Sequence, residues 1–303
     1  MSKNINVVCF GEVLWDKLPS GKKIGGAPLN VALRLNSFGY QTSMISRVGN
    51  DIDGKNILDF VLGSGIQGII QIDKNLDTGI VNVEINEEGN ANYHIKQPCA
   101  WDNIKYEKEL VEVVKDTDAF IFGSLVCRSE ESASTLFRLL DHATFKVLDV
   151  NLRKPYYSIK ILLKLMEKAD FIKLNEEELY EICNELGARG KSIAEKIKII
   201  SEKTATNHIC VSRGAQGVVL YYKGEYLHNT GFRIRVKDTI GAGDSFLAAY
   251  VSEVLKNTSP SMALDFACAV GSLVASKEGA NCQISGTEIK KLMWMDEFVI
   301  SRS

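Results

Sequence analysis

Residues 236–251 read VKDTIGAGDSFLAAYV, a stretch in which Gly241 and Gly243 stand directly before Asp244 and an apolar run. The apolar residues from 246 to 255 recur at helical spacing, so we expect a helix that begins close to the glycines. Glycine tolerates backbone angles that let several N–H groups converge on one point, and the start of a helix adds the positive end of its dipole. The stretch therefore predicts a turn and helix that can hold an anion.

Asp244 has two interpretations that these residues alone leave open. An acidic residue in the first turn of a helix is favourable because of the helix dipole, and this needs no functional explanation. A carboxylate beside an anion site would, however, repel the anion, so a functional interpretation requires chemistry that needs the carboxylate there.

Outward from this stretch, segments typical of strands and helices alternate along most of the chain. Short apolar runs predict strands at 5–10, 42–49, 118–124, 145–150, 170–174 and 208–214. Helical patterns cover 28–39, 53–65, 130–143, 158–169, 175–187 and two segments between 242 and 276. Regular βα alternation predicts an α/β fold with an open, mostly parallel central sheet and helices on both faces.

One region interrupts this alternation. Residues 78–86 and 90–96 form two strand-like runs joined by a turn that contains Gly89, and 11–23 can add further extended segments. These pieces predict a small antiparallel β lid built from about 12–24 and 78–100. Because the sequence shows no internal repeat and no Pro-rich linker, we expect a single domain over 1–303 that carries this lid.

Composition narrows the classes of function. The chain has 303 residues, with 36 Lys and Arg against 38 Asp and Glu, and this net charge of −2 argues against nucleic acid as a partner. No apolar run is long enough for a membrane span, and the N-terminus lacks the features of a signal peptide. Seven dispersed cysteines without a Cys-x-x-Cys pair indicate free thiols, so we expect a cytoplasmic protein without a membrane partner.

Two motif-like segments are better explained as turns. GSGIQG (63–68) matches the dinucleotide-binding template but follows a helical pattern and precedes a strand-like run, the reverse of the required context. GARGKS (187–192) resembles the end of a phosphate-binding loop but lacks its first glycine and also follows a helix. Neither a zinc protease motif nor a Gly-x-Ser-x-Gly elbow is present in the sequence.

The segment DTIGAGDSF (238–246) resembles the C-terminal signature of the ribokinase-like (PfkB) family of sugar kinases. Further segments resemble family elements in the same order, namely GGAPLNVALRLNSFG (25–39), RVGNDIDG (47–54), DVNLR (149–153), KLNEEEL (173–179) and SRGAQG (212–217). The resemblance covers residues 5–285, and GEVLWDKLP, GGAPLNVA and AWDNI are most similar to bacterial fructokinases. It implies a ribokinase-like fold and ATP-dependent phosphorylation of a sugar, with D-fructose converted to fructose 6-phosphate.

The resemblance also gives the glycine turn a role. In the family, N–H groups of this turn stabilise charge that develops during phosphoryl transfer, and the aspartate takes the proton from the attacking sugar hydroxyl. This implies an anion hole formed by Gly241, Ala242 and Gly243, with Asp244 as the catalytic base. A base has to stand beside the phosphoryl group, and the helix dipole helps to keep it ionised.

The sugar-binding residues that the resemblance implies are Asp16, Gly25, Gly26, Asn30 and Arg153. The two glycines would let the sugar approach the backbone. Asn30 is equally typical of a polar residue in the first turn of a helix, and Arg153 of a solvated loop charge.

Nucleotide and metal ligands follow from the same resemblance. Asn175 and Glu178 are expected to position Mg²⁺ largely through water, although the pair also has the spacing of a helix capping box. Ser212, Gly214 and Gly217 are expected to lie under the phosphates and ribose of ATP.

Two further assignments are open. The resemblance places a monovalent cation such as K⁺ near Asp238 and Gly279, but Gln283 stands where the family often has a smaller hydroxyl residue. Trp101 and His94 would either face the sugar or pack within the lid.

Rival functions remain beside the fructokinase interpretation. Within the family they are a ribokinase, a 2-keto-3-deoxygluconate kinase and a nucleoside kinase, and outside catalysis a protein that senses sugar or nucleotide without turnover. The expected partners are a sugar and ATP, and the expected assembly is a homodimer through the lid or a monomer.

Overall fold

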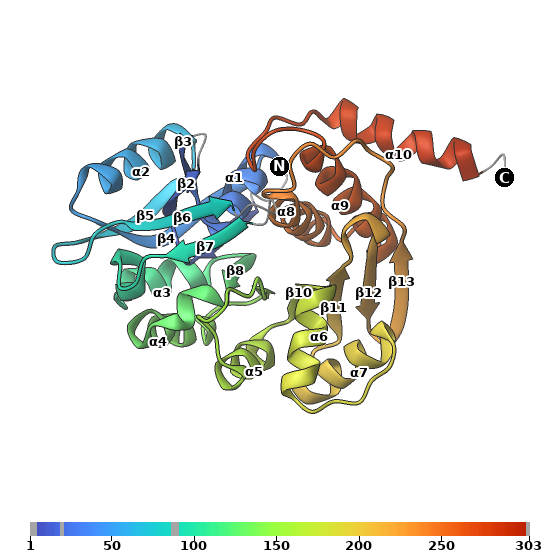
Figure 1. Ribbon diagram of the computed structural model, residues 1–303, viewed down its shortest axis with the longest axis horizontal. Helices are drawn as coiled ribbons and strands as arrows, with labels where there is room; N and C mark the ends of the chain where they lie inside the picture. Colours follow the sequence, from blue (N-terminus) through green and yellow to red (C-terminus); the bar gives the residue numbers. More distant parts are fainter. Residues whose placement is uncertain (1–4, 19–20, 86–90, 301–303) are drawn as a thin grey trace. The chain divides into compact units, whose positions relative to one another are not determined.

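The computed structural model describes residues 5–18, 21–85 and 91–300. The chain divides into two units. The first unit comprises Met1–Thr144 with Arg153–Tyr157, and the second comprises Phe145–Leu152 with Ser158–Ser303. Each unit has its own sheet strands and helices (Figure 1).

The first unit is built on four parallel strands in the order β8-β1-β4-β5. Their bounds are Asn6–Phe10 for β1, Gln41–Gly49 for β4, Gln67–Asp73 for β5 and Ala119–Gly123 for β8. The helices are α1 (Ala27–Ser37), α2 (Ile52–Gly63), α3 (Lys108–Lys115) and α4 (Glu130–Leu140), with 3-10 turns η1 (Ala100–Asn103) and η2 (Leu125–Arg128). Strands β1 and β8 are almost continuously buried, as expected for strands covered on both faces.

A second, smaller sheet of the first unit has the order β3-β2-β6-β7. Its strands are β2 (Leu14–Leu18), β3 (Gly21–Gly25), β6 (Gly79–Ile85) and β7 (Ala91–Ile95). The pairs β2–β3 and β6–β7 are antiparallel, whereas the two hairpins meet through a parallel pairing of β2 with β6. This sheet overlaps the expected lid segments, although β3 ends at Gly25, one residue beyond the expected 12–24. Residues 19–20 and the expected turn at Gly89 lie outside the described residues.

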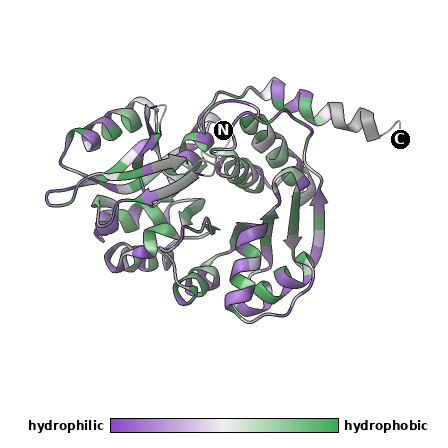
Figure 2. Cartoon of the chain, in the orientation of Figure 1, coloured by the Kyte–Doolittle hydropathy of each residue, from purple (hydrophilic) through white to green (hydrophobic). Residues whose placement is uncertain are grey.

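The second unit contains five strands in the order β13-β12-β11-β10-β9. Their bounds are Lys146–Asp149 for β9, Phe171–Asn175 for β10, His208–Ser212 for β11, Val218–Tyr222 for β12 and Glu225–Asn229 for β13. Its helices are α5 (Ile159–Lys168), α6 (Glu176–Glu185), α7 (Ile193–Thr204), α8 (Ala242–Leu255), α9 (Pro260–Ala275) and α10 (Gly286–Ile300), with the 3-10 turn η3 (Gly214–Gln216). Helices α6 and α7 carry both hydrophilic and hydrophobic residues, as helices on a sheet surface do (Figure 2).

The expected α/β architecture is confirmed, with mostly parallel strands flanked by helices and a small second sheet. GSGIQG runs from the last residue of α2 through a turn into the first two residues of β5, and GARGKS lies between α6 and α7, so neither leads from a strand into a helix, as expected. The alternation does not continue after β11, because β12 and β13 form an antiparallel hairpin. Its two-residue turn has positive φ at Lys223 and Gly224, a geometry that suits tight hairpins. No helix in the described ranges is long and apolar enough to cross a membrane.

Helix α8 is held in place by buried contacts along its length. It packs against α9 (Figure 1), and Tyr250 on α8 is fully buried beside Phe171 of β10. The Tyr250 hydroxyl lies 2.7 Å from Nε2 of His208 on β11. Burial lowers the pKa of His208 to about 4, so at neutral pH the imidazole is uncharged and one partner of a neutral hydrogen bond. These contacts fix the helix that begins at the glycine turn.

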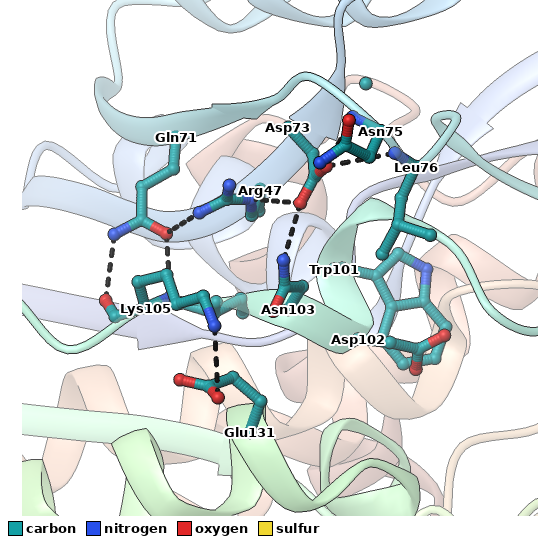
Figure 3. Close-up of polar contacts among 12 residues, drawn as sticks. Arg47, Gln71, Asp73, Asn75, Leu76, Trp101, Asp102, Asn103, Lys105 and Glu131 are labelled. Atoms are coloured by element: carbon teal, nitrogen blue, oxygen red, sulfur yellow. Dashed lines mark hydrogen bonds and ion pairs between the residues drawn. The ribbon is translucent and has the colours of Figure 1, made fainter.

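Asp73, at the end of β5, is the centre of a polar network that joins three segments of the first unit (Figure 3). Its carboxylate accepts hydrogen bonds from Nε of Arg47 at 2.8 Å, from Nδ2 of Asn103 at 2.7 Å, and from the N–H groups of Asn75 and Leu76. Burial alone would raise the pKa of Asp73, but these donors and the guanidinium of Arg47 outweigh it and hold the pKa at about 2.

The change Asp73→Asn is expected to destabilise the fold by about 3 kcal/mol, because it leaves a half-buried Arg47 without its charged partner. Since the pKa of Asp73 is depressed in the folded state, its stabilising contribution is full above the unfolded pKa of 3.8 and disappears as the pH falls toward about 2. Urea unfolding of the variant and of the unmodified protein at pH 7 and pH 3 measures this difference in the free energy of unfolding. Asp59→Asn, at an exposed position, is the control. An equal loss for both variants at pH 7 would contradict the role of the network.

Candidate active site

The glycine turn and the first turn of α8 have the geometry that an anion site needs. Gly241 is the N-cap residue, with φ 74°, and no side chain caps the helix. The N–H of Ala242 donates to the carbonyl oxygen of Thr239 at 3.2 Å, so this amide is used within the turn. Among the described residues, no hydrogen bond engages the N–H groups of Gly241 and Gly243. These two amides are therefore the better candidates of the three expected anion-hole positions, and Asp244 stands next to them.

The loop after α9 supports this turn from one side. A Cβ atom at Gly241 would lie 2.2 Å from Cβ of Ala280, so the close approach of the loop excludes any side chain at position 241. In the same loop, the N–H of Gly279 donates to Oδ2 of Asp238 at 3.0 Å, and Oδ1 of Asp238 accepts from the N–H of Ile240. The structure thus brings together Asp238 and Gly279, the two residues expected near a monovalent cation.

A buried cluster of charges lies behind the start of α8. Lys173 on β10 is paired in register with Asp149 on β9, and its Nζ lies 2.9 Å from Oδ1 of that aspartate. Burial alone would lower the pKa of Lys173, but the carboxylates of Asp149, Glu178 and Asp244 outweigh it and raise the pKa above its ordinary value. The lysine is therefore a buried cation at neutral pH.

Asn175 and Glu178 form the capping box of α6 that their spacing predicted. Oδ1 of Asn175 accepts from the N–H of Glu178 at 2.8 Å, and Oε2 of Glu178 accepts from the N–H of Asn175 at 2.7 Å. The other oxygen of Glu178 accepts from the N–H of Leu152, which ties the DVNLR segment to the helix. Burial raises the pKa of Glu178, and Lys173 partly offsets this rise.

The side-chain oxygens of Asn175, Glu178 and Asp149 suit a metal ion bound through water better than one bound directly. Within the described ranges, no three His, Cys, Asp or Glu side chains are grouped so that they could hold a metal ion. The two capping-box side chains already accept backbone hydrogen bonds, and Oδ2 of Asp149 is buried without a hydrogen-bond partner in the described part of the chain. Hard oxygen acceptors that contact a metal through water are typical of Mg²⁺ sites, so the residues fit that ion.

The segment expected under the nucleotide begins where β11 ends. Ser212 is paired in register with Asn175, so the carboxyl ends of β10 and β11 bring these two predicted residues side by side. Gly214 and Gly217 both have positive φ, and a Cβ atom at Gly217 would lie 1.9 Å from the carbonyl oxygen of Asn229. The glycines are therefore required by the turn itself.

In the first unit, Asp16 on β2 and Arg153 come within electrostatic range although they are distant in the chain. Burial raises the pKa of Asp16 to about 6, and Arg153 partly lowers it. A Cβ atom at Gly25 would lie 2.2 Å from Oδ2 of Asp16, so this glycine makes room for the carboxylate. Arg153 itself is exposed.

Gly26 and Asn30 lie at the start of α1. Gly26 is the N-cap residue with φ 117°, and a Cβ atom there would lie 2.4 Å from the carbonyl oxygen of Glu12. Pro28 occupies the first turn, as expected for a proline at a helix start. Asn30 is largely buried in the same turn.

Arg128, whose guanidinium lies in a cage formed by two aromatic rings and a carboxylate, was not identified from the sequence. The guanidinium of Arg128 lies 3.8 Å from the ring centre of Trp101 and 5.0 Å from that of Tyr156, and it makes two hydrogen bonds with Asp102. Trp101 is fully buried, so it packs within the lid core, whereas His94 is exposed. Tyr156 belongs to the short segment that carries Arg153, so the cage helps to position that segment.

Lys173 and Asp149 were also not assigned a role from the sequence, although both stand in segments that resemble the family. The available signal was a lysine inside an otherwise apolar strand-like run, FIKL. A charged residue in a strand buried on both faces needs a partner.

Comparison with known proteins shows similarity along most of the chain. A sequence model described as "pfkB family carbohydrate kinase" matches residues 10–285. The Arabidopsis thaliana protein "Probable fructokinase-2" is 25% identical, over 90% of this chain and 91% of its own. The crystal structure of fructokinase with bound ATP from Xylella fastidiosa superposes with a TM-score of 0.85 at 22% identity, covering 96% of this chain and 99% of that one. A double mutant of fructokinase from Vibrio cholerae O395, in a form with fructose, ADP and potassium ion bound, superposes with a TM-score of 0.83 at 20% identity. The superposition covers 96% of this chain and 98% of that one.

Proposed function

Because the chain belongs to the pfkB family of carbohydrate kinases, we propose that it transfers the terminal phosphoryl group of ATP to D-fructose and forms fructose 6-phosphate. The observation that carries this proposal is Asp244 in the first turn of α8, next to the N–H groups of Gly241 and Gly243. The name of the Arabidopsis relative supports fructose as the sugar.

In the proposed reaction Asp244 takes the proton from the sugar hydroxyl as its oxygen attacks the terminal phosphorus of ATP. A new P–O bond forms to the sugar, the bond from that phosphorus to the bridging oxygen breaks, and ADP leaves with the electron pair. The N–H groups of Gly241 and Gly243 would donate to the oxygens on which charge develops. The amides and the helix dipole also favour the ionised form of Asp244.

Each remaining group of residues has a place in this proposal. Ser212, Gly214 and Gly217 would contact ATP, and Asn175 and Glu178, with Oδ2 of Asp149, would orient the water shell of Mg²⁺. When bound, Mg²⁺ would neutralise part of the negative charge of the phosphate groups.

In the first unit, Asp16, Asn30 and Arg153 would hydrogen-bond the sugar hydroxyls, and Gly25 and Gly26 would leave room for the sugar beside the backbone. The small sheet would cover the sugar and exclude water. K⁺ near Asp238 and Gly279 is a further proposal that rests on the hydrogen bond between these residues. The free cysteines support a reducing, cytoplasmic setting, and an exposed edge of the small sheet would suit a homodimer.

Sugar binding is expected to weaken below pH 6. In this proposal the ionised carboxylate of Asp16 would accept hydrogen bonds from the sugar hydroxyls, and the ionised form is lost as the pH falls through its pKa of about 6. The KM for the sugar should therefore rise by up to about tenfold per pH unit below that value, which follows from single-group titration. Measurement of KM from pH 5 to pH 8 tests this. In Asp16→Asn the KM should be raised throughout and nearly independent of pH, and a pH-independent KM in the unmodified protein would contradict the role of Asp16.

A coupled ADP-release assay tests the function itself. Fructose, ribose, 2-keto-3-deoxygluconate, tagatose and adenosine are compared as acceptors at equal concentrations, with Mg²⁺ and with or without K⁺. The expected result is the highest kcat/KM for fructose. Preference for ribose or for 2-keto-3-deoxygluconate would replace fructose by that sugar within the family. Binding of ATP and sugar without ADP release would indicate a sensor and overturn the kinase proposal.

A further inference from the structure

Lys173 and Asp149 form an ion pair that the described residues leave incomplete. Both side chains are buried, at 7% and 4% exposure, and one hydrogen bond of 2.9 Å joins them. An ammonium group has three donors, and among the described residues Oδ1 of Asp149 is the acceptor for one of them. Oδ2 of Asp149 is buried and accepts no hydrogen bond from any residue that the structure describes. Because burying a charged pair is costly unless its remaining hydrogen bonds are satisfied, the pair is suited to bind a further polar group.

The position of the ammonium indicates which ligand would supply this group. A Cβ atom at Gly243 would lie 3.3 Å from Nζ of Lys173, so the cation reaches the backbone of the first turn of α8. The N–H groups at the start of a helix point away from it and can bind an anion, and here they have a full positive charge beside them. A Cβ atom at position 243 would require the ammonium to shift by only a few tenths of an ångström.

The charges around Lys173 restrict the ligand further. Asp149, Glu178 and Asp244 all act on the lysine electrostatically, so the cluster carries more negative than positive charge. An anion of low charge would be repelled by these carboxylates, and a neutral sugar would not need a buried cation. A highly charged phosphoryl group that arrives with a divalent cation fits, because Lys173 and the amides would contact its oxygens while the carboxylates face the cation.

We propose that Lys173 is a catalytic residue whose ammonium donates to the transferring phosphoryl group, with Asp149 holding it in position. This inference rests on the proposed kinase function and adds a residue to it. During transfer the bond from the terminal phosphorus to the ADP oxygen breaks and the bond to the sugar oxygen forms. Lys173 keeps its proton throughout and stabilises the charge on the phosphoryl oxygens that belong to neither bond.

The test compares Lys173→Met with Lys196→Met, a matched control on α7. Lys196 is also a buried lysine of the second unit, at 5% exposure, and it lies over the ring of Tyr180 rather than at the start of α8. In a steady-state assay, Lys173→Met is expected to lower kcat by about 100-fold or more with little change in the KM for the sugar, as for loss of one preorganised donor. Lys173→Arg should recover part of this loss, and Lys196→Met should retain kcat while losing thermal stability.

Equilibrium binding separates this inference from the proposed function. Titration calorimetry with Mg²⁺ compares ADP and the non-hydrolysable ATP analogue AMP-PNP, since the two ligands differ by the terminal phosphoryl group. Lys173→Met is expected to bind AMP-PNP about tenfold more weakly or worse, the loss typical of a charge-assisted contact, and ADP nearly as well as the unmodified protein. Equal losses for both nucleotides, or equal losses of kcat in the Lys173 and Lys196 variants, would overturn the role of Lys173. Absence of sugar turnover by the unmodified protein would instead overturn the proposed function, and the binding comparison would still decide the question of Lys173.

Discussion

Asparagine in place of Asp244 is expected to lower kcat by about 10²- to 10⁴-fold, the range for loss of a general base. The amide has nearly the same size and can remain in the first turn of α8, but it cannot accept the proton of the sugar hydroxyl at neutral pH. Since the proton moves only in the transition state, the KM values for sugar and ATP should change little.

Steady-state kinetics with fructose and ATP measure this effect, and Glu253→Gln is the control. Glu253 is an acidic residue of the same helix that pairs with Lys256 and accepts from the hydroxyl of Thr258, far along the helix from the glycine turn. Its variant should keep kcat. If Asp244→Asn retained the activity of the unmodified protein, another group would have to take the proton, and the proposed mechanism would be wrong.

Alanine in place of Gly241 is expected to cost about 10²- to 10³-fold in kcat, the range for loss of an oxyanion-type donor. Two independent features forbid a side chain there. The residue has φ 74°, a conformation that disfavours every residue with a Cβ atom, and the added atom would lie 2.2 Å from Cβ of Ala280. The turn has to shift away from the loop, and in the proposed reaction its N–H groups would then no longer be placed to donate to the phosphoryl oxygens.

The same change should also lower stability, so the kinetic effect needs a control for folding. Gly286→Ala serves this purpose, because Gly286 begins α10 in the same unit and an added Cβ atom meets nothing within 4 Å. Circular dichroism establishes the folded fraction of both variants, and kcat is then expressed per folded molecule. A Gly241→Ala protein that is folded and has normal kcat would show that the turn geometry does not contribute to transfer.

Much of the fold could be predicted because its signals are local. Strands such as β1 and β8 are continuous apolar runs, as strands covered on both faces must be, and they alternate with helices that have one apolar face. The hairpin of β12 and β13 was not predicted. Its turn depends on a positive φ at Lys223, and a lysine does not indicate this conformation. The parallel pairing of β2 with β6 was also beyond prediction, because it joins two hairpins that are far apart in the chain.

The candidate site divides in the same way. The glycine turn, Asp244 in the first turn of α8 and the capping box of Asn175 with Glu178 were determined by the sequence itself, because each depends on residues within one helical turn of one another. The pairing of Lys173 with Asp149 and the approach of Arg153 to Asp16 were decided only by the tertiary structure. A buried charge finds its partner through strand register and loop packing, and these follow from the burial of many distant side chains at once.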